Sequence, residues 1–157
     1  MKVILTVLFF LLAVILQTTS VSFLAIFGVI PNLVLIMVLV MVLLKGFDKS
    51  WKYIILIGFL LDLFSGLPFG LISLGLVSSS YLIDSLNRNV FSAVKFWIMS
   101  GLVALGILVY NLFLIGSARF FNLDLFLNLR YLIIEIIYDL LFAFIFFYVA
   151  KKIFHKK

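Results

Sequence analysis

An uncharged stretch near the start of the chain constrains the fold more than any other feature. Residues 3–44 contain no charged side chain. Because an α-helix rises about 1.5 Å per residue, one helix over this stretch would be about twice as long as the roughly 30 Å hydrocarbon core of a bilayer. We therefore expect two membrane spans joined by a turn.

The composition supports the same class. The chain is 67% hydrophobic and 11% charged, whereas soluble domains are typically about 45–50% apolar and about 25% charged. A soluble fold of this composition would lack polar side chains to cover its surface. The sequence therefore predicts an all-α membrane protein, with membrane lipid as its surroundings and one membrane domain over residues 1–157.

Breaks in the apolar pattern predict six transmembrane helices. Pro31 suits the first turn of the second helix, where a missing N–H is not needed, and the residue before Pro68 is disfavoured in a helix. Lys2 and the apolar run after it resemble a signal peptide, but no convincing cleavage site follows, so we interpret this run as a retained helix. The second and third helices are expected to be short, with a charged turn at residues 45–52 between them. The expected ranges are about 3–18, 31–44, 51–64, 69–86, 94–115 and 130–151.

The basic residues test this arrangement independently, because positive charges favour cytoplasmic loops. Six spans with both termini in the cytoplasm place ten basic residues inside and two outside. The net charge of +6 then mostly reflects the orientation of the chain in the membrane. The anionic headgroups of lipids are the expected partners of the basic side chains. The basic residues are split among separate loops, which argues against a nucleic-acid partner. The predicted inside set is Lys2, Lys45, Lys49, Lys52, Arg88, Lys95, Lys151, Lys152, Lys156 and Lys157, and the outside set is Arg119 and Arg130.

Asp62 is a carboxylate inside predicted membrane, next to a glycine and proline break at residues 65–70. In the topology above it lies in the outer third of the third helix. Non-helical backbone at membrane depth must be buried in protein or line a wet cavity. We expect Asp62 to accept hydrogen bonds from free N–H groups at the start of the next helix, near Phe69 and Gly70. The simpler alternative places Asp62 at the headgroup level, in contact with water.

A second set of polar residues lies in the last predicted helix. Glu135 and Asp139 are four residues apart and therefore share one helix face. Two close carboxylates could share a proton, as in a transporter or an aspartyl enzyme. We favour a buried polar contact between helices instead. The candidate partners are Asn111, the serines at 78–80, Arg130 and Lys95.

The sequence offers little for catalysis. It has no cysteine and one histidine, which lies in the basic C-terminal tail, so the usual nucleophile and metal arrangements cannot be assembled. We expect no enzymatic activity, no cofactor and no metal site.

Several short motifs together resemble the MreD family of bacterial rod-shape-determining membrane proteins. The resemblance covers residues 17 to about 86, whereas the second half matches in length and hydropathy alone. Its proline-asparagine element corresponds to Pro31 and Asn32, and its Gly-x-x-x-Asp element to Gly58 and Asp62. The motifs are Gln17-Thr18, Pro31-Asn32-Leu33, Lys45-Gly46, Gly58-Phe59-Leu60-Leu61-Asp62 and Gly66-Leu67-Pro68-Phe69-Gly70.

This resemblance implies a non-enzymatic subunit of the cell-elongation machinery in the bacterial plasma membrane. Such a subunit would bind the single-span protein MreC and help couple MreB filaments to the peptidoglycan synthases. The family's fold is similar to that of the six-helix substrate-binding subunits of energy-coupling-factor transporters. The alternative function is therefore a substrate-binding membrane subunit of a vitamin-type transporter. The implied partner-binding or architectural residues are Pro31, Asn32, Gly58, Asp62, Gly66, Pro68 and Gly70.

Overall fold

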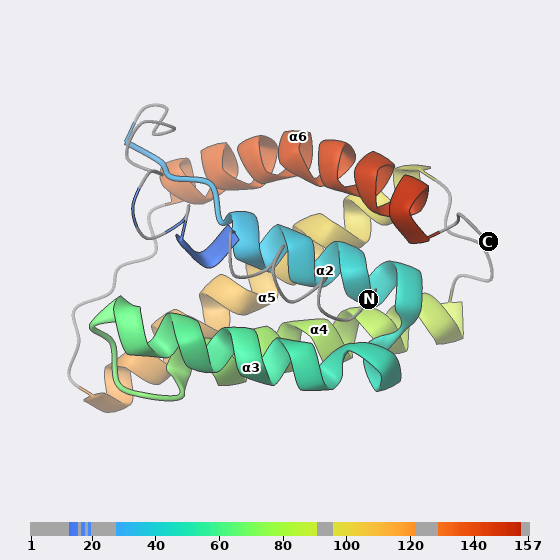
Figure 1. The fold of residues 1–157 in the computed structure, drawn as a ribbon. Helices are drawn as coiled ribbons and strands as arrows, with labels where there is room; N and C mark the ends of the chain where they lie inside the picture. Colours follow the sequence, from blue (N-terminus) through green and yellow to red (C-terminus); the bar gives the residue numbers. More distant parts are fainter. Residues whose placement is uncertain are drawn as a thin grey trace.

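The computed structural model shows an all-helical protein (Figure 1). It describes residues 13–15, 17, 19, 28–90, 96–121 and 129–154, with the backbone alone at 89, 90, 96, 97, 129 and 150–154. Most of the predicted first helix, 3–18, lies outside the described residues. The helices are α2 (Leu33–Lys45), α3 (Phe47–Ser65), α4 (Leu71–Val90), α5 (Phe96–Ala118), the short 3₁₀ helix η2 (Arg119–Phe121) and α6 (Leu129–Phe154).

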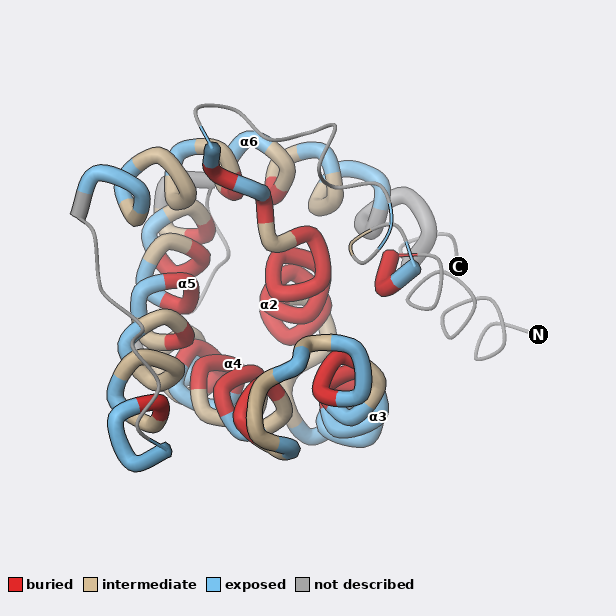
Figure 2. Tube along the Cα trace, turned by 90° about the vertical axis from the view of Figure 1, so that its left-hand side faces the viewer, coloured by how far each residue is buried: buried red, intermediate tan, exposed pale blue. Residues whose placement is uncertain are grey.

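Helix α2 lies at the centre of the bundle (Figure 2). Every residue from Leu33 to Leu43 is buried, and α2 contacts each of α3, α4, α5 and α6. A helix that is apolar on all sides is expected to be buried all round. Inside a membrane, moving an apolar helix from lipid into the bundle gains no hydrophobic free energy, so close packing of side chains must hold α2 against its neighbours. Gly106 of α5 provides one close approach, since a Cβ there would lie 2.8 Å from Cδ1 of Leu39.

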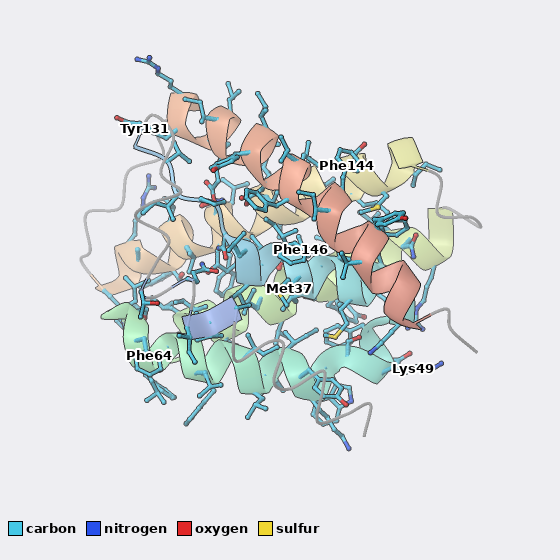
Figure 3. The ribbon with its side chains drawn as sticks, turned by 45° about the horizontal axis from the view of Figure 1, so that its top comes forward. Met37, Lys49, Phe64, Tyr131, Phe144 and Phe146 are labelled. Carbon is cyan, nitrogen blue, oxygen red and sulfur yellow. The ribbon has the colours of Figure 1, made fainter. Side chains whose placement is uncertain are left out.

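The helices run alternately in opposite directions, which separates two ends of the bundle (Figure 1). The turn from α2 to α3 lies at one end, together with the last residues of α4 and the first residues of α5 (Figure 1). We call this the basic end because Lys45, Lys49 and Arg88 lie there. The turn from α3 to α4 lies at the other end, together with η2 and the first residues of α6, and we call this the break end (Figure 1). Tyr131 lies at the same end as Phe64, and Lys49 lies at the opposite end (Figure 3).

Large apolar side chains cover much of the outer surface of the bundle. The exposed residues lie on the outward sides of the helices around α2 (Figure 2). On α6 five exposed aliphatic residues recur every fourth position and form a continuous stripe. They are Ile133, Ile137, Leu141, Ile145 and Val149. In the part of the chain that the structure describes, two helical segments are long and apolar enough to cross a membrane, Ile98–Phe121 and Arg130–Val149. The six-span arrangement stays a prediction.

Several predicted helix bounds are wrong by a few residues. Helix α3 begins at Phe47 rather than at residue 51, so most of the expected charged turn at 45–52 is helical. With 19 residues, α3 is about 28 Å long and not short. Helix α2, with 13 residues, is short as expected. Helices α2, α4, α5 and α6 end one to four residues past their predicted C-terminal limits, at residues 45, 90, 118 and 154 instead of 44, 86, 115 and 151.

An ion-pair cluster ties the basic end together. Nη2 of Arg88 lies 2.8 Å from Oδ2 of Asp48 and 2.8 Å from Oδ2 of Asp84. Hydrogen bonds to Asp48 and Asp84 raise the pKa of Arg88. Gly46, between α2 and α3, has φ +82°, and a Cβ there would lie 2.9 Å from Nη2 of Arg88. The α2–α3 turn is therefore held close to the C-terminal part of α4.

Candidate functional site

Asp62 is buried at the C-terminal end of α3 and binds the first turn of α4. Its Oδ1 accepts a hydrogen bond from the N–H of Ile72 at 2.9 Å, and its Oδ2 accepts one from the N–H of Ser73 at 3.2 Å. The Ser73 hydroxyl also donates to Oδ2. The second and third N–H groups of a helix are those that an N-cap side chain normally binds. Asp62 therefore caps α4 from a neighbouring helix, where Gly70 just before α4 has no side chain to do so.

This contact differs from the prediction in its donors. We expected N–H groups near Phe69 and Gly70, but α4 begins at Leu71, so the free donors lie two to four residues further on. Asp62 is 4% exposed, which disagrees with the alternative of a carboxylate in contact with water at the headgroup level.

Gly58 lies one turn before Asp62 on the same face of α3 and faces the same residue of α4. A Cβ at Gly58 would lie 2.6 Å from Cα of Ser73 and 3.0 Å from its Cβ. A side chain there would push the backbones apart, and close approach through small residues is how helices pack in membranes. The Gly-x-x-x-Asp spacing therefore has two linked roles, because glycine brings α4 near and aspartate caps it.

The break at residues 65–70 uses glycines for backbone conformation. Gly66 ends α3 with φ +68° and Gly70 has φ +96°, and nothing lies within 4 Å of a Cβ built at either position. Positive φ is the reason for glycine at both sites.

Hydrogen bonds also order the break. Ser65 donates from its hydroxyl to the carbonyl oxygen of Asp62 at 3.2 Å and accepts from the N–H of Leu67 at 3.2 Å. The carbonyl of Pro68 accepts from the N–H of Leu71 at 3.2 Å, so the break is an ordered turn.

Asn32 organises the start of α2. Its Oδ1 accepts from the N–H of Leu35 at 3.1 Å, as an N-cap does, and from Nε2 of Gln17 at 3.0 Å. Oε1 of Gln17 in turn accepts from the N–H of Val34 at 2.8 Å. Pro31 precedes this cap, so the prediction that it lies in the first helical turn is wrong by two residues.

Helix α6 completes a polar region around the start of α2. Oδ1 of Asp139 accepts from the backbone N–H of Asn32 at 3.0 Å. Nδ2 of Asn111 on α5 donates to the two carboxylate oxygens of Glu135 at 3.3 and 3.4 Å. The predicted polar contact between helices is confirmed for Glu135 and Asn111, and Asp139 binds the α2 N-terminus instead.

Tyr110 links the two polar regions. Its side chain hydrogen-bonds that of Asn32 and interacts electrostatically with both Asp62 and Glu135. A Cβ at Gly75 of α4 would lie 3.1 Å from Cδ2 and Cε2 of Tyr110, so the ring fits against a glycine. We call the whole set the polar layer. It consists of Gln17, Asn32, Asp62, Ser73, Tyr110, Asn111, Glu135 and Asp139.

Three members of the polar layer were not singled out as site residues from the sequence. Gln17 entered the argument through the family motif alone, and Ser73 is one of several serines in α4. Tyr110 offered the clearest missed signal, because a buried tyrosine usually needs a partner for its hydroxyl.

The polar layer has no arrangement that suggests metal chemistry. Over the described ranges, no three His, Cys, Asp or Glu side chains gather in a way that could hold a metal ion. The single histidine, His155, lies outside those ranges. No protein-family model, no curated protein and no solved structure matches the chain. The resemblance to the MreD family, which rests on the motif residues alone, therefore stays a prediction.

Proposed function

We propose that this protein is a non-enzymatic, multi-pass subunit of the cell-elongation complex in the bacterial plasma membrane, with both termini in the cytoplasm. It binds an MreC-like single-span protein and through it helps couple MreB filaments to the peptidoglycan synthases. One observation carries the proposal. The hydrogen bonds of Asp62 go to its own chain, at Ile72 and Ser73, so the residue shapes the α3–α4 unit and is not free for catalysis.

The surface beside this unit suits a partner helix. Apolar side chains around the break are strongly exposed and come from α3, the break and α4. They are Phe59, Leu63, Phe64, Phe69 and Leu74. The ring of Phe59 meets that of Phe69 edge-on, with centroids 4.9 Å apart, so the break itself carries part of this surface. We call these five residues the break surface.

Binding of a small polar ligand is less well supported. A transport subunit needs free polar groups for its substrate. In the polar layer, Asn32 and Gln17 bind backbone at the start of α2, and Glu135 binds Asn111. These groups hold helices together, as in an assembly subunit.

Site-specific photo-crosslinking in cells tests the proposal. A photoreactive residue at Leu63 or Leu74 should crosslink to a single-span protein with a periplasmic coiled coil. The matched control is Ile137, which is equally apolar and 65% exposed but lies on α6, across the bundle from α3 (Figure 2). Crosslinks from Ile137 alone would contradict the assigned surface. Co-purification with an ATPase module, or with a retained vitamin, would contradict the function.

A further inference from the structure

Asp139 has a fully buried carboxyl group in which one of the two oxygens is hydrogen-bonded within the described structure and the other is not. Its relative exposure is 0%. Oδ1 accepts the Asn32 N–H, whereas for Oδ2 the described part of the chain provides no hydrogen-bond partner. Every other carboxyl group of the polar layer is fully engaged, because Asp62 and Glu135 each accept through both oxygens. Asp139 is therefore the exception that needs an explanation.

Among the residues that the structure describes, no charge neutralises Asp139. The charged group that acts on it is Glu135, one turn earlier on α6, and this has the same sign. Helix α2, which packs against α6, carries no charged residue before Lys45 at the basic end. Helix α5 contributes the neutral side chains of Tyr110 and Asn111, and Asp62 of α3 is a further acid. Arg130 lies more than two turns away on α6 and is exposed.

A buried, ionised carboxylate with an unpaired oxygen and a like charge nearby is strongly unfavourable, since burial of a charge costs far more than burial of a neutral carboxyl. A proton on Oδ2 removes the charge. It leaves Oδ1 free to accept the Asn32 N–H as before. We propose that Asp139 is a proton-binding site that holds α6 against the start of α2.

Glu135 is the route by which this proton exchanges. It is partly exposed, whereas Asp139 is not, and the two lie on one face of α6. The proton passes from Asp139 to Glu135 and on to water at the break end, and no other bond changes. When it leaves, the uncompensated charge favours water entry between α6 and α2. The α2–α6 contact therefore weakens as the pH rises.

Infrared difference spectroscopy of the purified full-length protein in detergent tests this directly. The carbonyl stretch of a protonated carboxylic acid should be present at neutral pH and disappear on alkaline titration, in a series from about pH 5 to about pH 9. Asp139→Asn should remove one such band, and because the amide oxygen can still accept the Asn32 N–H, this variant should fold. Asp62→Asn is the matched control, since Asp62 already has donors on both oxygens, and it should leave the band in place.

Glu135→Gln gives a second, independent readout. It removes the like charge but keeps Asp139, so the protonated-acid band of Asp139 should persist and the pH at which it disappears should change. Because a neighbouring negative charge disfavours the charged form, we expect the shift to lower pH. An unchanged spectrum in Asp139→Asn would overturn the proposal, as would an Asp139→Asn protein whose melting temperature keeps the pH dependence of the unchanged protein.

Discussion

Asp62 of α3 caps α4 by binding both the backbone N–H and the hydroxyl of Ser73. Gly58, one turn earlier, permits this because a Cβ in its place would overlap the Cα of that same serine. The two residues of the Gly-x-x-x-Asp motif thus act on one residue of the next helix. The motif is therefore explained by packing and capping, and catalysis is not needed to account for its carboxylate.

Replacement of Asp62 by Leu should damage the fold more than replacement by Asn. Leucine leaves the N–H groups of Ile72 and Ser73 without an acceptor, at about 1–3 kcal/mol for each buried group. Asparagine keeps one acceptor oxygen. Thermal melting and the monodisperse fraction in detergent measure the difference. Equal loss of folded protein in the two variants would contradict the capping role.

Gly58→Ala should destabilise the protein, because the added methyl would lie 2.6 Å from backbone of α4. Overpacking of this kind typically costs about 1–3 kcal/mol. Gly101→Ala is the matched control, since it is also helical and has nothing within 4 Å of the added Cβ. Alanine is a better helix former than glycine by about 1 kcal/mol, so the control should be neutral or stabilising. A melting temperature that falls equally in both variants would argue against a tight α3–α4 contact.

The sequence predicted the helices well where a residue marks their ends. Gly66 and Pro68 fixed the end of α3 to within one residue, because positive φ and proline both stop a helix. The start of α3 was missed by four residues. Asp48, Lys49 and Lys52 indicated a turn, but their side chains are exposed at the basic end, and the exposed first two turns of a helix accommodate charge.

The partners within the polar layer could be predicted only in part. Asn111 was one of several candidate partners for Glu135 and Asp139, because a carboxylate in an apolar bundle needs a polar partner. The contacts of Asp139 with Asn32 and of Tyr110 with Asn32 join segments 107 and 78 residues apart. Such contacts depend on which helices are neighbours, and periodicity within one helix does not determine that.

The Asn111–Glu135 contact between α5 and α6 should be measurable as a coupling energy. Polar contacts between membrane helices average about 0.6 kcal/mol in double-mutant cycles and reach about 1.7 kcal/mol. The cycle consists of Asn111→Leu, Glu135→Leu and the double variant, followed by unfolding in mixed micelles, because each single change must remove the hydrogen bond. We expect a positive coupling within that range. Additive effects of the two changes would mean that the hydrogen bonds at 3.3 and 3.4 Å contribute nothing to stability.

The two ion pairs of Arg88 should contribute unequally although both distances are 2.8 Å. The side chain of Asp48 is 76% exposed, so water and salt screen its pair and the contribution is small. The side chain of Asp84 is 9% exposed, so it is poorly hydrated and depends more on Arg88. Asp84→Asn should therefore lower the melting temperature more than Asp48→Asn, and added salt should reduce the Asp48 effect further. Equal shifts at low salt, or a larger shift in Asp48→Asn, would show that burial does not set the strength of this cluster.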